Sequence, residues 1–273
     1  MNQRVLTALL MAPLAISALL WLPTSILMPL VAVIFLLAAW EWAALIGIEG
    51  AAGRAAVLLP PAALMAWLSH QSSHLHNLYP LVTLIGCVWW LLATLWLLRP
   101  RLLAGNAPVK RGAKLLILVL LIVPAWAGLA LLHADEPVGP RWALFAIALV
   151  WAADTGAFYA GTRIGGRKLC PSISPGKTWA GFWGGLTAAL LLSSACFALL
   201  GLGIAQLPAL LLLTLVTALA SVLGDLFESV IKRQGGAKDS GHLIPGHGGV
   251  FDRVDSVVAA LPVFAVGKVW LGL

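Results

Sequence analysis

Long apolar segments alternate with short polar ones along the whole chain. Several of the apolar segments reach about 18 residues or more, the length that lets a helix cross the hydrocarbon of a bilayer. No alternation of apolar and polar residues with a period of two is visible, which argues against a transmembrane β-barrel. The pattern predicts nine membrane-spanning helices, at residues 5–21, 26–46, 55–69, 78–98, 115–132, 141–160, 178–200, 207–228 and 256–272.

Composition supports an all-α, polytopic transmembrane protein, because 61% of the residues are hydrophobic, 10% are charged and the mean hydropathy is +0.99. Backbone amides in hydrocarbon must be satisfied within their own segment, so apolar segments of this length become helices. We expect a single integral membrane domain over residues 1–273, with N-terminal spans in 1–140 and C-terminal spans in 141–273. The first segment lacks a convincing cleavage site for a signal peptidase, so we expect an uncleaved first helix.

The distribution of Lys and Arg predicts which side of the membrane each loop faces. Short loops rich in these residues normally stay in the cytoplasm. With nine spans and a cytoplasmic N-terminus, all of the 17 Lys and Arg residues except Arg141 and Lys268 fall on the cytoplasmic side. The net charge of +7 therefore reflects orientation and attraction to anionic lipid headgroups. Nothing in the chain resembles a nucleic-acid-binding module, and we expect no nucleic-acid partner.

Acidic residues inside the predicted spans are the first candidates for function, since each costs about 2.5 to 3.5 kcal/mol on insertion scales. The eighth segment carries Ser221, Asp225, Glu228 and Lys232 at positions i, i+4, i+7 and i+11. This spacing makes one polar stripe on an otherwise apolar helix, which should face the protein interior. A buried ion pair of Lys232 that serves only packing is the alternative.

Two further aspartates, Asp252 and Asp255, lie at the start of the last predicted helix. Their i, i+3 spacing places both carboxylates on one face of the first turn. Either could also serve as a helix cap. Together with Asp225 they supply the hard oxygen ligands that Mg²⁺ prefers, and Mg²⁺ keeps its other positions for water and substrate phosphates. The sequence therefore predicts a divalent metal site between two helix ends.

The connection between the last two predicted spans is rich in glycine and in positive charge. Such a loop is ordered by turns, and its backbone N–H groups can approach a phosphate closely. We therefore expect it to bind a polyphosphate, with nonspecific binding of lipid headgroups as the alternative. Its glycines are Gly235, Gly236, Gly241, Gly246, Gly248 and Gly249, and its cations are Lys232, Arg233, Lys238 and Arg253.

A second polar stretch, CPSISPGKTWAG, spans residues 170–181. Its Gly-Lys-Thr resembles the end of a Walker A motif, but the first glycine of that motif is replaced here by Pro171. We expect Ser174, Lys177 and Thr178 at the start of the seventh helix, where free N–H groups and the helix dipole favour an anion. A capped helix start with a snorkelling lysine would explain them equally well.

Asp154, near the end of the sixth segment, would line one cavity with Ser174, Lys177 and Thr178, or else be a locally hydrogen-bonded carboxyl group. Glu41 in the second segment would be a buried structural group or an interfacial one, and its role stays open. His70 and His74 have a metal-ligand spacing but lie in a loop on the opposite side of the membrane, so we expect no site there. The three cysteines are scattered and indicate neither a disulfide framework nor a metal site.

Residues 229–255, SVIKRQGGAKDSGHLIPGHGGVFDRVD, resemble the C-terminal signature of the phosphatidate cytidylyltransferases, also called CDP-diacylglycerol synthases. The pattern S-x-x-K-R-x4-K-D followed by P-x-H-G-G-x-x-D-R-x-D is complete. The resemblance extends upstream through SVLGDLFES and SPGKTWAG to ADTGAFYAG, which begins at Ala153. Before that residue it holds only by hydropathy. Ala180 stands where the family often has Glu, which puts in doubt any polar role at that position.

The resemblance implies that CTP and phosphatidate react to CDP-diacylglycerol and pyrophosphate in phospholipid biosynthesis, at the cytoplasmic side of a bacterial inner membrane. It also implies a requirement for Mg²⁺ and favours Asp225 and Asp252 as its ligands, with a two-ion site left open. The attacking lipid phosphate oxygen is already anionic, so the task is to bring two anions together. The expected catalytic residues are Asp225, Lys232, Arg233, Lys238, Asp239, His247, Asp252, Arg253 and Asp255. The expected substrate-binding residues are Asp154, Ser174, Lys177, Thr178, Ser229, Gly248 and Gly249.

Two other functions fit the hydropathy pattern less well. A transporter of an anionic substrate should have balanced halves and a site near the midplane, whereas the polar residues here crowd the cytoplasmic half of the C-terminal spans. A CDP-alcohol phosphotransferase should carry the pattern D-G-x2-A-R-x8-G-x3-D-x3-D, which is absent. Apolar span surfaces serve lipid and partner helices alike, so a homodimer stays open.

Overall fold

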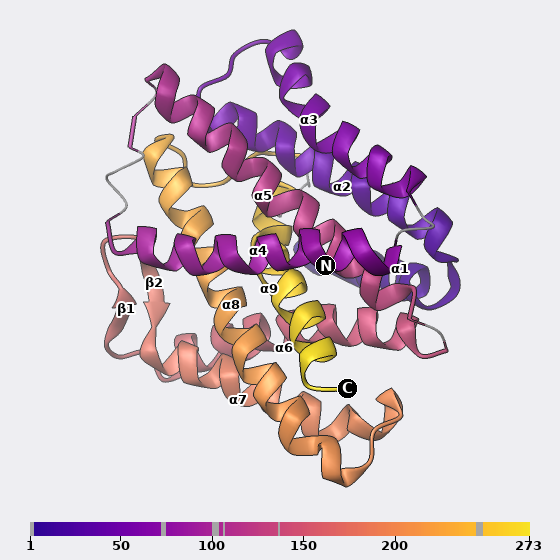
Figure 1. Cartoon of the computed structure of the whole chain (residues 1–273). Helices are drawn as coiled ribbons and strands as arrows, with labels where there is room; N and C mark the ends of the chain where they lie inside the picture. The colour runs from indigo at the N-terminus through magenta and orange to yellow at the C-terminus, as the bar shows by residue number, and fades with distance from the viewer. Residues whose placement is uncertain (1–2, 72–74, 100–103, 106, 136, 244–247) are drawn as a thin grey trace.

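The computed structural model describes all residues except 1–2, 72–74, 100–103, 106, 136 and 244–247. Over the described residues the chain is a bundle of nine α-helices with one small hairpin (Figure 1). The helices are α1 Gln3–Trp21, α2 Thr24–Leu45, α3 Ala51–His70, α4 Leu75–Leu97, α5 Pro108–His133, α6 Gly139–Arg163, α7 Trp179–Cys196, α8 Leu207–Gln234 and α9 Phe251–Trp270. The two strands are β1 Lys168–Cys170 and β2 Ser174–Thr178, and two short 3-10 turns, Phe197–Leu200 and Ile204–Gln206, connect α7 to α8.

The all-α prediction is confirmed, and each predicted apolar segment holds one of these helices. Seven of them, α2 to α8, are long and apolar enough to cross a membrane. Large apolar side chains such as Leu14, Leu91 and Leu95 are exposed on the outside of the bundle. Water-soluble proteins rarely expose so much apolar surface, whereas a bilayer covers it. The chain is therefore an integral membrane protein, while a ninefold crossing and a cytoplasmic N-terminus stay predictions.

The two largest extensions beyond the predicted helix ends, at the start of α5 and the end of α8, both have local causes. Helix α5 begins at Pro108, because proline at the first helical position lacks only an N–H that has no partner there. Helix α8 continues past its apolar part to Gln234, and Lys232 pairs one turn back with Glu228. The apolar pattern ends at the charged residues, but the helix continues through them.

The stretch before α7 is a strand rather than a helix start. Strand β2 pairs antiparallel with β1, with Lys168 opposite Thr178 and Cys170 opposite Ser174. The expectation that Ser174 and Lys177 lie in the first turn of the helix is therefore wrong. Only Thr178 has the expected role, since its Oγ1 accepts a hydrogen bond from Gly181 N at 3.0 Å and caps α7.

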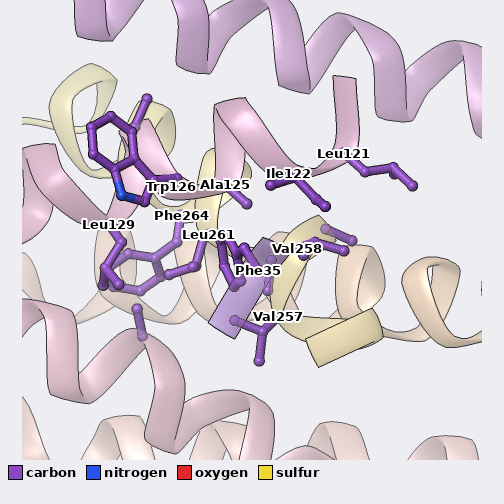
Figure 2. Packing of buried hydrophobic residues seen from close by; sticks show 14 of the residues in the cluster. Phe35, Leu121, Ile122, Ala125, Trp126, Leu129, Val257, Val258, Leu261 and Phe264 are labelled. Carbon is purple, nitrogen blue, oxygen red and sulfur yellow. The ribbon is translucent and has the colours of Figure 1, made fainter. Parts of the chain in front are cut away.

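Helix α9 lies at the centre of the bundle and contacts α2, α4, α5, α6 and α8 (Figure 1). Its Val257, Val258, Leu261 and Phe264 are buried in the cluster that Figure 2 shows, together with residues of α5. A helix that is apolar on all sides belongs in such a place. The charged first turn of α9 is therefore held rigidly at one end of the bundle.

Helices α6 and α7 pack closely because small residues line their contact. A side chain at Gly185 would place its Cβ 2.6 Å from Ala153 O on α6. At Gly156 the Cβ would meet Gly184 O of α7 at 2.6 Å. Such positions let two membrane helices approach without side chains between them. The contact brings Asp154 of α6 next to the hairpin that precedes α7.

Candidate active site

A cavity of about 430 Å³ lies between α6, β2, α7, α8 and α9. One part of its wall is apolar and includes Phe158, Phe182, Leu186, Leu219 and Val222. The polar part of its wall consists of Asp154, Thr162, Lys177, Thr178, Ser221, Asp225, Asp252, Arg253, Asp255 and Ser256. The cavity is thus lined by both kinds of surface that a molecule with an apolar body and a charged head requires.

Three carboxylates meet between α8 and α9. Asp225, Glu228 and Asp255 each offer an oxygen, and these three oxygens all lie within 4.8 Å of one another. Glu228 and Asp255 are buried, and Glu228 Oε1 has no hydrogen-bond partner. The helices can approach here because residue 224 is glycine: an added Cβ would collide with Asp255 O and lie 2.9 Å from Ala259 Cβ.

Two lysines face these acids from different elements. Lys177 Nζ on β2 lies 2.5 Å from Asp225 Oδ2. Lys232 Nζ on α8 lies 2.5 Å from Glu228 Oε2 and 2.7 Å from Asp252 Oδ1 on α9. The predicted polar stripe on α8 therefore does face the interior, and its lysine joins α8 to α9.

Asp252 is held differently from the three clustered carboxylates. Besides Lys232, it accepts hydrogen bonds from Ser240 N at 3.2 Å and 3.0 Å, one to each oxygen, and from Gly249 N at 2.8 Å. Burial alone would raise the pKa of Asp252, but the hydrogen bonds from Lys232 and Gly249 outweigh it and lower the pKa to about 2. Asp252 is therefore an ionised group with a full set of donors.

The predicted metal ligands Asp225 and Asp252 line the same cavity, but only Asp225 belongs to the cluster of three oxygens. Asp255, predicted as a catalytic residue, is a member of that cluster. The predicted site does not include Glu228, which the sequence marks only as a costly charge in the eighth segment. Its position three residues after Asp225 on one helix face was the signal that could have included it.

Two glycines of the loop contact a side chain of the protein rather than an open phosphate site. Gly248 has φ +83, which a residue with a side chain rarely adopts, and an added Cβ there would lie 2.8 Å from Asp252 Oδ2. Gly249 donates its N–H to the same carboxylate. In this structure the predicted phosphate-binding backbone thus shapes the surroundings of Asp252.

The structure places the other predicted site residues in different surroundings. Asp154 and Arg253 line the cavity, and Ser229 Oγ donates to Asp225 Oδ1 at 3.4 Å. Ser174, Arg233, Lys238 and Asp239 lie outside the cavity wall, with Asp239 in the wall of a second cavity of about 480 Å³. His247 lies outside the described residues.

Comparisons with known proteins agree with this picture. A family model described as the cytidylyltransferase family matches residues 2–269. The phosphatidate cytidylyltransferase of Pseudomonas aeruginosa is 40% identical over 97% of this chain and 96% of its own length. The phosphatidate cytidylyltransferase of Haemophilus influenzae is 48% identical over 45% of this chain and 43% of its own length. That of Bacillus subtilis is 44% identical over 46% of this chain and 47% of its own length.

Proposed function

Because this chain belongs to the phosphatidate cytidylyltransferase family, we propose that it transfers the cytidylyl group of CTP to phosphatidate and forms CDP-diacylglycerol and pyrophosphate. The observation that carries the proposal is the cavity with an apolar wall on one part and paired acids and lysines on the other. Phosphatidate has apolar chains and an anionic head, so both of its parts find a matching wall there. The enzyme class, a nucleotidyltransferase, follows from the family.

The reaction needs positioning and charge neutralisation more than a strong base. A phosphate oxygen of phosphatidate attacks the α-phosphorus of CTP in line, the bond from that phosphorus to the bridging oxygen breaks, and pyrophosphate leaves. Lys177, Lys232 and Arg253 are the cations at or beside the cavity that can offset the charge of two approaching anions. Asp154 and Thr178 would contact substrate from the α6 and α7 side of the cavity.

The predicted Mg²⁺ fits the donor set at the junction of α8 and α9. The three clustered carboxylates supply hard oxygens, and Glu228 Oε1 is a buried oxygen without a partner. We expect Asp225 to be a ligand, with Glu228 and Asp255 beside it. When bound, the ion would neutralise phosphate charge and orient the two substrates. A second ion stays a prediction.

Asp252 is the less favourable of the two predicted ligands. An ionised carboxylate offers about four lone-pair positions, and Asp252 accepts four hydrogen bonds. It would have to exchange one of these bonds for the metal. Lys232 is the donor that can move, because the other three bonds come from the backbone.

The orientation proposal rests on where the charged residues gather. The last turns of α6 and α8, the strand β2 and the first turn of α9 all contribute to one end of the bundle. These elements and the hairpin carry Arg163, Lys168, Lys177, Lys232, Arg233 and Arg253, and the adjoining loops carry Arg167 and Lys238, as expected of a cytoplasmic face. We propose that this face meets cytoplasmic CTP at a bacterial inner membrane, with nine spans and a cytoplasmic N-terminus. A homodimer stays a prediction.

The proposal is tested with purified protein in detergent micelles that contain phosphatidate. We expect radiolabelled CTP to yield CDP-diacylglycerol and one pyrophosphate per product, and chelation of Mg²⁺ to stop both. Diacylglycerol in place of phosphatidate is the control, because it lacks the attacking phosphate. Pyrophosphate release without a lipid product, or flux of an anion across liposomes without turnover, would contradict the proposal.

A further inference from the structure

Glu41 on α2 is buried, with only 3% of the residue exposed. In the sequence it is far from the acids of the cavity. A buried carboxylate is expensive unless donors satisfy it. Glu41 Oε2 accepts hydrogen bonds from Ser240 Oγ at 3.0 Å and from Phe251 N at 2.8 Å. Both donors belong to the segment that leads into α9 and Asp252.

The loop backbone closes tightly over this carboxylate. A Cβ added to Gly241 would collide with Glu41 Oε1, and a Cβ added to Gly249 would collide with Glu41 Oε2 and with Ser240 Oγ. Two glycines of the family signature therefore leave room for one side chain from the other half of the protein.

Ser240 connects Glu41 to Asp252 through both of its polar groups. Its hydroxyl donates to Glu41 and accepts from Asp252 N at 3.2 Å. Its own N–H donates to both oxygens of the Asp252 side chain. The orientation of the Asp252 carboxylate thus depends on Ser240, and the position of Ser240 depends on Glu41.

We propose that Glu41 is a positioning residue of the active site, which acts through Ser240 and Phe251 N to hold the Asp252 carboxylate at the cavity. The inference rests on the proposed function. It assigns to α2, which the family signature does not reach, a part in the reaction. A carboxylate that only stabilised the fold would change how much protein folds, but not the turnover of the folded protein.

The test compares Glu41→Ala and Glu41→Gln with Glu49→Gln. Glu49 is the matched control, because it is exposed in the loop after α2 and the change in charge is the same. In Glu41→Gln the amide oxygen can still accept both hydrogen bonds. We expect Glu41→Ala to lower kcat by about tenfold to a hundredfold, Glu41→Gln by about threefold or less, and Glu49→Gln not at all. The KM values for CTP and phosphatidate should stay within about twofold.

A second measurement separates positioning from general damage. Deuterium exchange of the amides in residues 239–243 and 248–252 should speed up in Glu41→Ala, while the amides of α3 exchange as in the unchanged protein. Ser240→Ala should lower kcat by about threefold to tenfold, and Glu41→Gln combined with Ser240→Ala should lose no more than Ser240→Ala, because the two act in series.

Several results would overturn the inference. They are an unchanged kcat in Glu41→Ala, an unchanged kcat in Ser240→Ala, or equal losses in Glu41→Ala and Glu41→Gln. If Glu41→Ala does not fold, Ser240→Ala and Glu41→Gln decide the question. Failure of the unchanged protein to make CDP-diacylglycerol would instead refute the proposed function, so the two failures are distinguishable.

Discussion

The two ends of the bundle differ in whether their charged and polar side chains have partners within the protein. At the end away from the cavity, Lys268 Nζ lies 2.5 Å from Asp135 Oδ2 and 4.9 Å from the centre of the Trp142 ring. Nearby, His133 bonds with Thr24 Oγ1 at 2.8 Å and with Leu19 O at 3.0 Å. These groups have found local partners and gain nothing from a ligand.

At the cavity end the acids outnumber their partners. Asp154, Asp225, Glu228, Asp252 and Asp255 share the neighbourhood of Lys177, Lys232 and Arg253, and one oxygen of Glu228 stays without a hydrogen bond. Like charges held together in a membrane protein destabilise it unless something else binds there. The comparison teaches that buried charge alone does not indicate function, whereas unbalanced buried charge does.

The largest contrast between the two ends should come from neutralising one acid at each. We expect Asp225→Asn to lower the formation of CDP-diacylglycerol by at least about a hundredfold, because it removes one carboxylate charge from the cluster that is proposed to hold Mg²⁺. Asp135→Asn, the same change at the paired end, should leave turnover unchanged. Initial rates on protein of matched melting temperature check both, and equal rates in the two variants would refute the distinction.

The next contrast concerns the two strands of the hairpin. Lys177→Ala should lower kcat by about tenfold to a hundredfold, since it removes the cation that lies against Asp225. Lys168→Ala on β1 removes an exposed lysine that does not line the cavity, and it should leave kcat within about twofold. Steady-state kinetics with both substrates varied distinguish the two. If only Lys168→Ala lowered kcat, the required positive charge would lie on β1 and the prediction for Lys177 would be wrong.

A smaller effect should follow from adding one methyl group to the loop. Gly249→Ala forces a Cβ against Ser240 and Glu41, so we expect about 1 to 3 kcal/mol of destabilisation and about a tenfold loss of activity. Gly203→Ala is the control at the other end, because no atom lies within 4 Å of its added Cβ. The melting temperature and the turnover rate are measured for both variants. Equal values for Gly249→Ala and Gly203→Ala would contradict the prediction.

The smallest effect should come from breaking the paired end itself. Lys268→Ala removes an ion pair with the exposed Asp135 and a contact with an aromatic ring, which together contribute about 1 kcal/mol. We expect a melting temperature lower by a few degrees and an unchanged kcat. A clear fall of kcat in the folded variant would mean that the two ends are coupled.

Hydropathy and local spacing predicted the helices because both depend on neighbours along the chain. The stripe with Asp225 and Lys232 also follows from helical periodicity, and the first turn of α9 from an i, i+3 spacing. The hairpin before α7 was missed, because three- and five-residue strands that pair only with each other leave no periodic pattern. The ion pair of Lys177 with Asp225 was missed for the same reason, since it depends on where the hairpin lies.

Contacts between distant segments were beyond the reach of local patterns. Glu41 and Ser240 are 199 residues apart, and neither residue carries a sign of the other in its own surroundings. The sequence leaves Glu41 as either a buried structural group or an interfacial one. Its partners became visible once α2, the glycine loop and α9 were placed together in space.

The central position of α9 has a consequence for how the protein is made. A ribosome synthesises the other eight described helices before α9, and N-terminal parts of a chain generally assemble first. We therefore expect those helices to leave the ribosome before the helix that packs between them. Asp252 and Asp255 arrive with that last helix, so we expect no activity until α9 has been synthesised and has packed between the other helices.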